Sequence, residues 1–132
     1  APAACGAVTG ESSKAPAAPK GRANYGDPAY WEQRYRDSGS DSTYEWLLGS
    51  EAFVDWVGPH IAPAQRLLQL GSGNSRVAEV LAARGFRDVT SIDISPAAVE
   101  ASRARAAGFP ALTFVLGDVL DMAAFPDASF DA

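Results

Sequence analysis

One stretch of the sequence decides the fold of this chain: Arg66-Leu67-Leu68-Gln69-Leu70-Gly71-Ser72-Gly73-Asn74. Its first five residues form a short, mostly apolar run, which is typical of a buried strand. The four that follow are rich in glycine, which lets a backbone turn sharply. Residues 75–84 then repeat apolar side chains at helical spacing, and Gly85 ends the predicted helix. The stretch therefore predicts a strand, a turn and a helix.

The same alternation continues toward the C-terminus. Residues 89–94 form a second apolar run, and Ser95-Pro96 combines a helix cap with a first-turn proline. That helix is expected to run to about Ala107, and residues 112–116 predict a third strand. Strands that alternate with helices indicate a parallel sheet. We therefore predict an α/β fold, a Rossmann-like doubly wound parallel sheet, with its strands in the order 3-2-1.

The two ends of the chain depart from this pattern. Residues 1–24 are rich in Ala, Pro and Gly, and we expect a flexible leader there, because so little apolar surface cannot offset the entropy of ordering. At the other end, Phe130-Asp131-Ala132 resembles the opening of a fourth strand. We therefore expect residues 25–132 to be the N-terminal half of a domain, truncated at its C-terminus.

An aromatic segment precedes the predicted sheet. Asp27-Pro28 should begin a helix in which Trp31 and Tyr35, four residues apart, share one face. Trp46 follows in a polar loop, and Ser50 is expected to cap a second short helix. Helical aromatic pairs often pack into a core, but their flat faces also suit an adenine ring or a sulfonium cation.

Composition narrows the classes of function. The chain has 132 residues, a formal net charge of −5 and a sequence pI of about 4.7. This acidic balance argues against nucleic acid as a partner, and no apolar run is long enough to predict a membrane span. The chain has one cysteine, Cys5, and one histidine, His60. We expect no disulfide framework and no metal site, and a reducing, cytoplasmic location.

Acidic residues follow the second and third predicted strands. Asp93 ends the second strand, 22 residues after Gly71 at the end of the first, and Asp118 follows the third. Open α/β sheets bind ligands at the carboxyl ends of their strands, where a carboxylate can accept both hydroxyls of a ribose. Each residue has a simpler alternative role, since Asp93 could cap the following helix and Asp118 could be a turn residue. Their joint pattern with the glycine turn favours a nucleoside site.

The glycine turn also discriminates between nucleotides. A dinucleotide-binding fingerprint has a third glycine where this chain has Arg76. That residue, with the aromatic segment, disfavours an NAD-dependent oxidoreductase. A cofactor without a pyrophosphate does not require the full fingerprint.

The sequence resembles the seven-β-strand (class I) S-adenosylmethionine-dependent methyltransferases. The resemblance covers about residues 25–132 and is nearest to the branch of the elongation factor 1-alpha lysine methyltransferases and the methyltransferase-like-13 proteins. One departure is Ser72, where that branch often has cysteine. The blocks that carry the resemblance are Tyr30-Trp31-Glu32-Gln33-Arg34-Tyr35, Tyr44-Glu45-Trp46, Leu70-Gly71-Ser72-Gly73-Asn74-Ser75, Ser91-Ile92-Asp93-Ile94-Ser95 and Phe125-Pro126-Asp127-Ala128-Ser129-Phe130-Asp131.

The resemblance implies an activity and a site. The cofactor would be S-adenosylmethionine and the acceptor a protein lysine, with elongation factor 1-alpha as the protein substrate. Gly71 and Gly73 would approach the methionine moiety, and Asp93 would hold the ribose. The remaining cofactor-binding residues would be Trp31, Tyr35 and Trp46 around the pocket, Ile94 beside the adenine, and Asp118 with Val119 at the adenine edge.

No catalytic residue is identified in the sequence. A non-catalytic, truncated nucleotide-binding or interaction module remains the alternative to an enzyme, because three strands make a marginal core.

Overall fold

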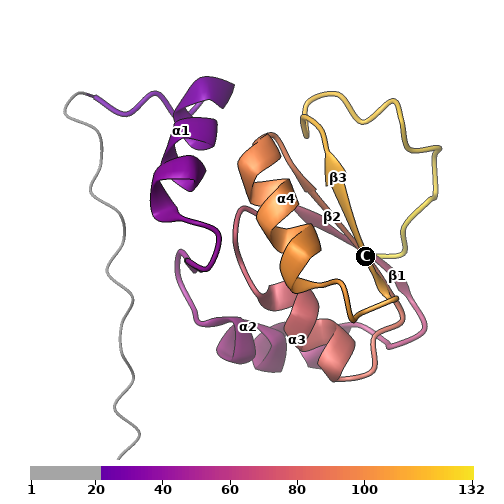
Figure 1. Cartoon of the computed structure of the whole chain (residues 1–132). Coiled ribbons are helices and arrows are strands. Elements are labelled where there is room, and N and C mark those ends of the chain that lie inside the picture. Colours follow the sequence, from indigo (N-terminus) through magenta and orange to yellow (C-terminus); the bar gives the residue numbers. More distant parts are fainter. Residues whose placement is uncertain (1–21) are drawn as a thin grey trace, which may run out of the picture.

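The computed structural model describes residues 22–132, and a three-stranded parallel sheet lies at its centre (Figure 1). The strands are β1 (Arg66–Leu70), β2 (Asp88–Asp93) and β3 (Leu112–Leu116), in the order β1-β2-β3. Their register pairs Leu70 with Ile92, and Asp93 with Leu116. The predicted parallel α/β sheet and its strand order are confirmed. Because the strands are parallel, their carboxyl ends meet at one edge of the sheet.

Helices α3 (Val77–Ala83) and α4 (Pro96–Arg105) follow β1 and β2 and lie to one side of the sheet (Figure 1). As expected, Ser95 caps α4 by accepting a hydrogen bond from the Ala98 N–H, at 3.2 Å. Helix α3 is shorter than residues 75–84, because the backbone of residues 75 and 76 stays in the turn. The hydrophobic core between helices and sheet consists of Val54, Leu67, Val77, Ala78, Leu81, Phe86, Val89, Val99, Ala106 and Phe114.

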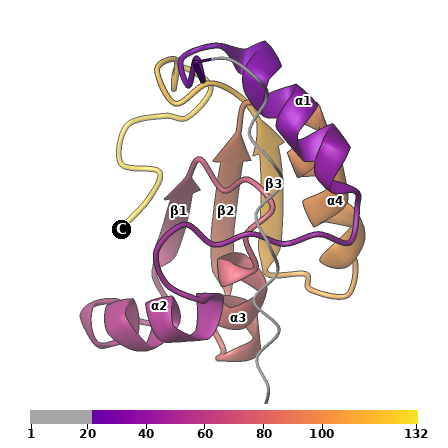
Figure 2. The same ribbon diagram turned by 90° about the vertical axis from the view of Figure 1, so that its left-hand side faces the viewer.

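Helix α1 (Pro28–Ser38) packs against α4, as Figure 2 shows, and α2 (Ser50–Val57) packs against α3. Asp27 caps α1 as predicted, since its carboxylate accepts from the Ala29 N–H at 2.9 Å. The predicted cap of α2 is wrong. Gly49 is the N-cap, and Ser50 is the first helical residue, with its hydroxyl donated to Glu45. A short 3-10 helix, η1 (Gly58–His60), follows α2. No helix within residues 22–132 is long and apolar enough to span a bilayer.

The C-terminal residues lie along the outer edge of β1 (Figure 2). The Ala132 N–H donates to the Arg66 carbonyl at 3.4 Å, and the Leu68 N–H donates to the Ala132 carbonyl at 2.9 Å. One residue bonding to both neighbours of Leu67 is the pattern of a parallel ladder. The Arg66 guanidinium also binds Asp131 and lowers the pKa of that carboxyl to about 2. Residues 130–132 therefore pair with β1 as a fourth parallel strand would, although they are not assigned as a strand. The leader expected at residues 1–24 lies almost wholly outside the described residues.

Candidate functional site

A cavity of about 390 Å³ lies at the carboxyl ends of the three strands, beneath α1. Its volume falls within the range of small-molecule sites, about 300–1,000 Å³. Eight of the nine cofactor-binding residues expected from the sequence line it, although they come from positions 31 to 119. We call it the strand-end cavity. Its lining consists of Tyr25, Gly26, Pro28, Trp31, Tyr35, Trp46, Gly71, Asp93, Ile94, Gly117, Asp118, Val119 and Leu120.

The turn after β1 depends on two glycines with positive φ. Gly71 has φ +61° and Gly73 has φ +51°, in the left-handed region that side chains with a Cβ avoid. A Cβ added at Gly71 would meet open space, so a ligand can approach the backbone there. A Cβ added at Gly73 would collide with the Tyr35 hydroxyl. Gly73 is the one expected residue that does not line the strand-end cavity, because the Tyr35 ring packs against it.

Asp93 is 6% exposed and joins the turn to α4. Its Oδ2 accepts from the Gly73 N–H at 2.7 Å, and its Oδ1 accepts from the Ser95 N–H at 2.9 Å. The alternative role as a local cap is therefore real, but it does not exclude ligand binding. A carboxylate has about four acceptor positions, and the protein fills two of them.

Tyr35 faces this carboxylate from α1. Burial, and after it the negative charge of Asp93, raise the pKa of Tyr35 to about 12. The phenol therefore stays neutral at physiological pH and presents a hydroxyl, not a second anion, beside the turn. A neutral donor is compatible with a cofactor that carries its own charges.

Asp118 lies across the cavity, after β3. Its Oδ1 accepts from the Leu120 N–H at 2.9 Å, so Asp118 does shape a local turn. Its other oxygen has no hydrogen-bond donor within residues 22–132 and is available to a ligand. Apolar side chains flank it, with Val119 at 43% and Leu120 at 90% exposure. A carboxylate between exposed apolar groups can accept from the amine of a flat, apolar ring.

Three aromatic side chains form the wall of the cavity on the N-terminal side. Trp31 stacks with Tyr35 at a centroid distance of 6.2 Å and contacts Trp46 at 6.1 Å. The alternative of a core role does not hold, because Trp31 and Tyr35 are half-buried and lie outside the hydrophobic core, and Trp46 is 58% exposed. These rings are held where they can contact a ligand.

The polar side chains that hold this wall in place were not predicted from the sequence. Glu32 on α1 accepts from the Ser95 hydroxyl at 2.6 Å and from the Ala97 N–H at 3.0 Å. These contacts, with Arg36 after them, lower the pKa of Glu32. Glu45 and Asn74 make similar long-range bonds. The only signal in the sequence was their place inside the aromatic and glycine blocks, since their partners are about 30 or more residues away.

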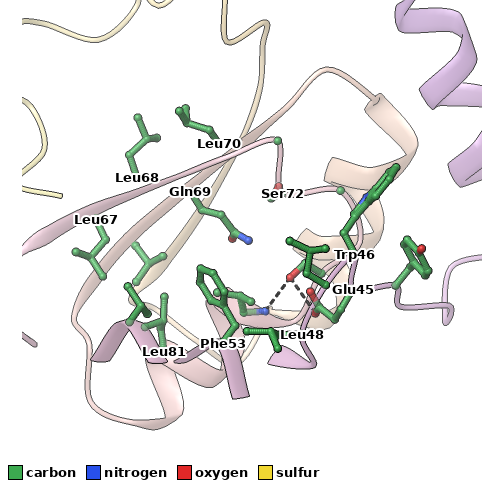
Figure 3. Close-up of a pocket in the computed structure, with 18 of the residues that line it drawn as sticks. Glu45, Trp46, Leu48, Phe53, Leu67, Leu68, Gln69, Leu70, Ser72 and Leu81 are labelled. Carbon is green, nitrogen blue, oxygen red and sulfur yellow. Dashed lines mark hydrogen bonds between the residues drawn. The ribbon is translucent and has the colours of Figure 1, made fainter. Parts of the chain in front are cut away.

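A second, larger cavity of about 500 Å³ lies along β1, and Figure 3 shows it. Leu67 and Leu81 lie at one end of it, and Glu45, Trp46 and Ser72 at the other. The two cavities share Tyr35, Trp46 and Gly71. The turn and its aromatic wall therefore separate an apolar groove at the sheet edge from the strand-end cavity.

The chain matches a family of known proteins over the region that carries the turn and the strands. The family described as "Methyltransferase domain" matches residues 68–132. The bovine EEF1A lysine methyltransferase 4 is 38% identical over 125 residues, which cover 95% of this chain and 49% of that protein. A Drosophila melanogaster eEF1A lysine and N-terminal methyltransferase homolog is 36% identical over 113 residues, 85% of this chain and 16% of that protein.

Solved structures agree on the fold. The SAM-dependent methyltransferase from Thiobacillus denitrificans, in complex with S-adenosyl-L-homocysteine, superposes with a TM-score of 0.53 at 22% identity. The match covers 64% of this chain and 36% of that one. This chain spans about half the length of the bovine relative. The sequence matches and the shared fold together show that the chain belongs to the class I S-adenosylmethionine-dependent methyltransferases.

Proposed function

We propose that the protein transfers a methyl group from S-adenosylmethionine to a lysine of a protein substrate, and that the strand-end cavity binds the cofactor. One observation carries the site: a single cavity gathers eight residues that the family pattern assigns to the cofactor. Those residues come from α1, the loop before α2, and the ends of all three strands. The parallel topology accounts for the residues at the strand ends, but it does not account for the three aromatic residues from α1 and the loop before α2 that meet them there.

The donors and acceptors of the cavity fit an adenosine. Asp93, with acceptor positions left over, would hold the ribose hydroxyls, and Asp118 would accept from the exocyclic amine of the adenine. Ile94 and Val119 would flank the ring. Gly71, which has open space beside it, would lie against the methionine moiety, and the wall of Trp31, Tyr35 and Trp46 would face the sulfonium.

The cofactor supplies an activated methyl group on a positively charged sulfur. The acceptor amine must arrive neutral, because only its lone pair can form the new nitrogen–carbon bond as the sulfur–carbon bond breaks. The amine then releases a proton to solvent. The described residues would position the cofactor, and the aromatic wall would exclude water from it. None of these residues is assigned as the base that takes the proton of the amine.

The acceptor is proposed from the relatives. The bovine and Drosophila proteins carry eEF1A lysine methyltransferase names, so a lysine of elongation factor 1-alpha is the first candidate. A cytoplasmic location would bring the two together and is proposed with it.

Calorimetry with the full-length protein tests the cofactor. We expect S-adenosylmethionine to bind with one site per chain and NADH to show no heat of binding. Binding of NADH alone would return the site to the oxidoreductase alternative.

Mass spectrometry of elongation factor 1-alpha incubated with the protein and S-adenosylmethionine tests the transfer. We expect a mass increase of one or more methyl groups on a lysine peptide. Cofactor binding without any transfer to this substrate would contradict the acceptor and favour the non-catalytic module.

A further inference from the structure

Residues 42–46, here called the strap, cross the glycine turn between α1 and α2. Asn74 holds the strap by its backbone: its Oδ1 accepts from the Tyr44 N–H at 3.1 Å, and its Nδ2 donates to the Ser42 carbonyl at 2.8 Å. Asn74 is 5% exposed, so its carboxamide is largely shielded from water, and both bonds are partly buried. A carboxamide that bonds to both an N–H and a carbonyl of one segment mimics the next strand of a sheet and fixes that segment in position and direction.

Glu45, within the strap, binds the other side of the same turn. Its Oε1 accepts from the Ser75 hydroxyl and from the Arg76 N–H, both at 2.9 Å, and also from the Ser50 hydroxyl. Helix α3 has no side-chain cap of its own at Arg76. The carboxylate of the strap therefore satisfies N–H and O–H groups that the turn and the start of α3 leave without a partner.

The strap also contacts α1. The Arg34 guanidinium lies over the Tyr44 ring at 5.4 Å and over the Trp46 ring at 5.9 Å. Trp46 contacts the rings of Trp31 and Tyr44 as well, and it is 58% exposed. Its place in the wall thus depends on the backbone of the strap, which Asn74 and Glu45 fix.

We propose that Asn74 and Glu45 are positioning residues for the cofactor, which hold the strap on the glycine turn so that Trp46 closes the strand-end cavity. Neither residue lines that cavity, so neither touches the cofactor. They increase the fraction of molecules in which Trp46 lies over the cavity. The apparent affinity for a ligand falls in proportion when that fraction falls. This inference rests on the proposed function.

Substitution of Asn74 by alanine removes both bonds to the strap. In the full-length protein we expect the KM for S-adenosylmethionine to rise about tenfold, with kcat within about twofold of its original value, since the bound state stays the same. Glu45→Gln, which keeps the shape and one acceptor, should raise the KM less. Amide exchange at Tyr44 should speed up in both variants without cofactor and recover when the cofactor saturates.

A double-mutant cycle separates positioning from a general structural role. If Asn74 acts through Trp46, then Trp46→Ala should raise the KM, and Asn74→Ala added to it should have almost no further effect. Additive losses would mean that Asn74 supports the turn independently of Trp46 and would overturn the inference.

Two control variants complete the experiment. Val54→Ala opens the core at α2 without touching the strap, and should lower the melting temperature but leave the KM unchanged. Glu51→Gln removes an exposed glutamate that pairs with Arg84 and should change neither. If the unaltered protein binds S-adenosylmethionine and Asn74→Ala binds it equally well, the inference fails while the proposed function stands. If the unaltered protein does not bind it, both fail.

Discussion

Two regions of the molecule are held in place by different forces. One is the sheet with the helices packed on it, and the other is α1 together with the strap. The central strand β2 buries its apolar side chains almost completely, with Val89 and Ile92 each 1% exposed. Helix α1 has no fully buried residue and is attached through Glu32, Arg34 and its rings. The first region begins before the sheet in the sequence, because Val54 of α2 belongs to the hydrophobic core.

This difference separates two tasks. Burial is insensitive to direction, so it fixes where the strand ends lie but does little to place one ring over a cavity. Hydrogen bonds to carboxylates and amides are directional and individually weak, so they can place the wall and release it. The site combines a rigid floor of strand ends with a wall that polar groups control, and single substitutions can test each part alone.

The largest effect should come from the core. Phe114→Ala empties a buried position on β3 and should lower the free energy of unfolding by about 3–5 kcal/mol, as measured in urea. Exchange at α1 amides should change only through global unfolding. A selective release of α1 would contradict the division between the two regions.

Asp93 links the glycine turn to α4. If it holds the ribose as proposed, Asp93→Ala should weaken S-adenosylmethionine binding about a hundredfold, because charged hydrogen bonds would be lost. Calorimetry measures the affinity. Asp121→Ala, which removes an exposed carboxylate in a nearby turn, is the control and should bind normally. An unchanged affinity in Asp93→Ala would remove the ribose assignment.

The two glycines of the turn offer a matched pair. Gly71→Ala should destabilise the protein by about 1 kcal/mol, since only the positive φ opposes the new Cβ. Gly73→Ala should cost more, because its Cβ also meets Tyr35 of the wall. Adding Tyr35→Phe removes the hydroxyl and should recover part of that extra loss in urea unfolding. Equal effects of the two alanines would show that wall and turn are not in contact in solution.

Glu32 should give the smallest effect and the clearest dependence on pH. The Ala97 N–H, then the Ser95 hydroxyl, lower its pKa in the folded protein. Its contribution is therefore present above the ordinary pKa of a glutamate and is lost as the pH falls through and below it. Glu32→Gln should cost about 1 kcal/mol or less at neutral pH and make exchange in α1 insensitive to mild acid. Exchange that accelerates equally in both proteins on acidification would assign the effect to another group.

Much of the fold could be predicted because it is local. Strands 66–70 and 112–116 and the caps at Asp27 and Ser95 depend on residues a few positions apart, and the structure has them as predicted. The cap at Ser50 was wrong because the helix begins one residue earlier: the Gly49 carbonyl accepts from the Phe53 N–H, so Gly49 is the N-cap, and the Ser50 hydroxyl donates to Glu45. The start of α3 was also predicted too early. The helix begins at Val77, because the Arg76 N–H before it donates to Glu45 of the strap, 31 residues away.

The candidate site was predictable as a set of residues but not as an arrangement. Glycines, Asp93 and Asp118 follow strands, and parallel strands bring such residues to one edge. The wall could not be derived in this way, because the bonds of Asn74 to residues 42 and 44 and of Glu32 to residue 97 join distant parts of the chain. Nothing in the local pattern distinguishes these side chains from solvated ones.

The pairing of Ala132 with β1 has a consequence for how the sheet can grow. Beyond Leu68 the outer edge of β1 has no further backbone partner within residues 22–132, and Leu70 at its end is 58% exposed. An open, apolar strand edge is a template for a strand of another molecule. A strand that adds at this edge, from the same or another molecule, would continue the register that Ala132 begins, and Leu70→Lys should weaken its addition.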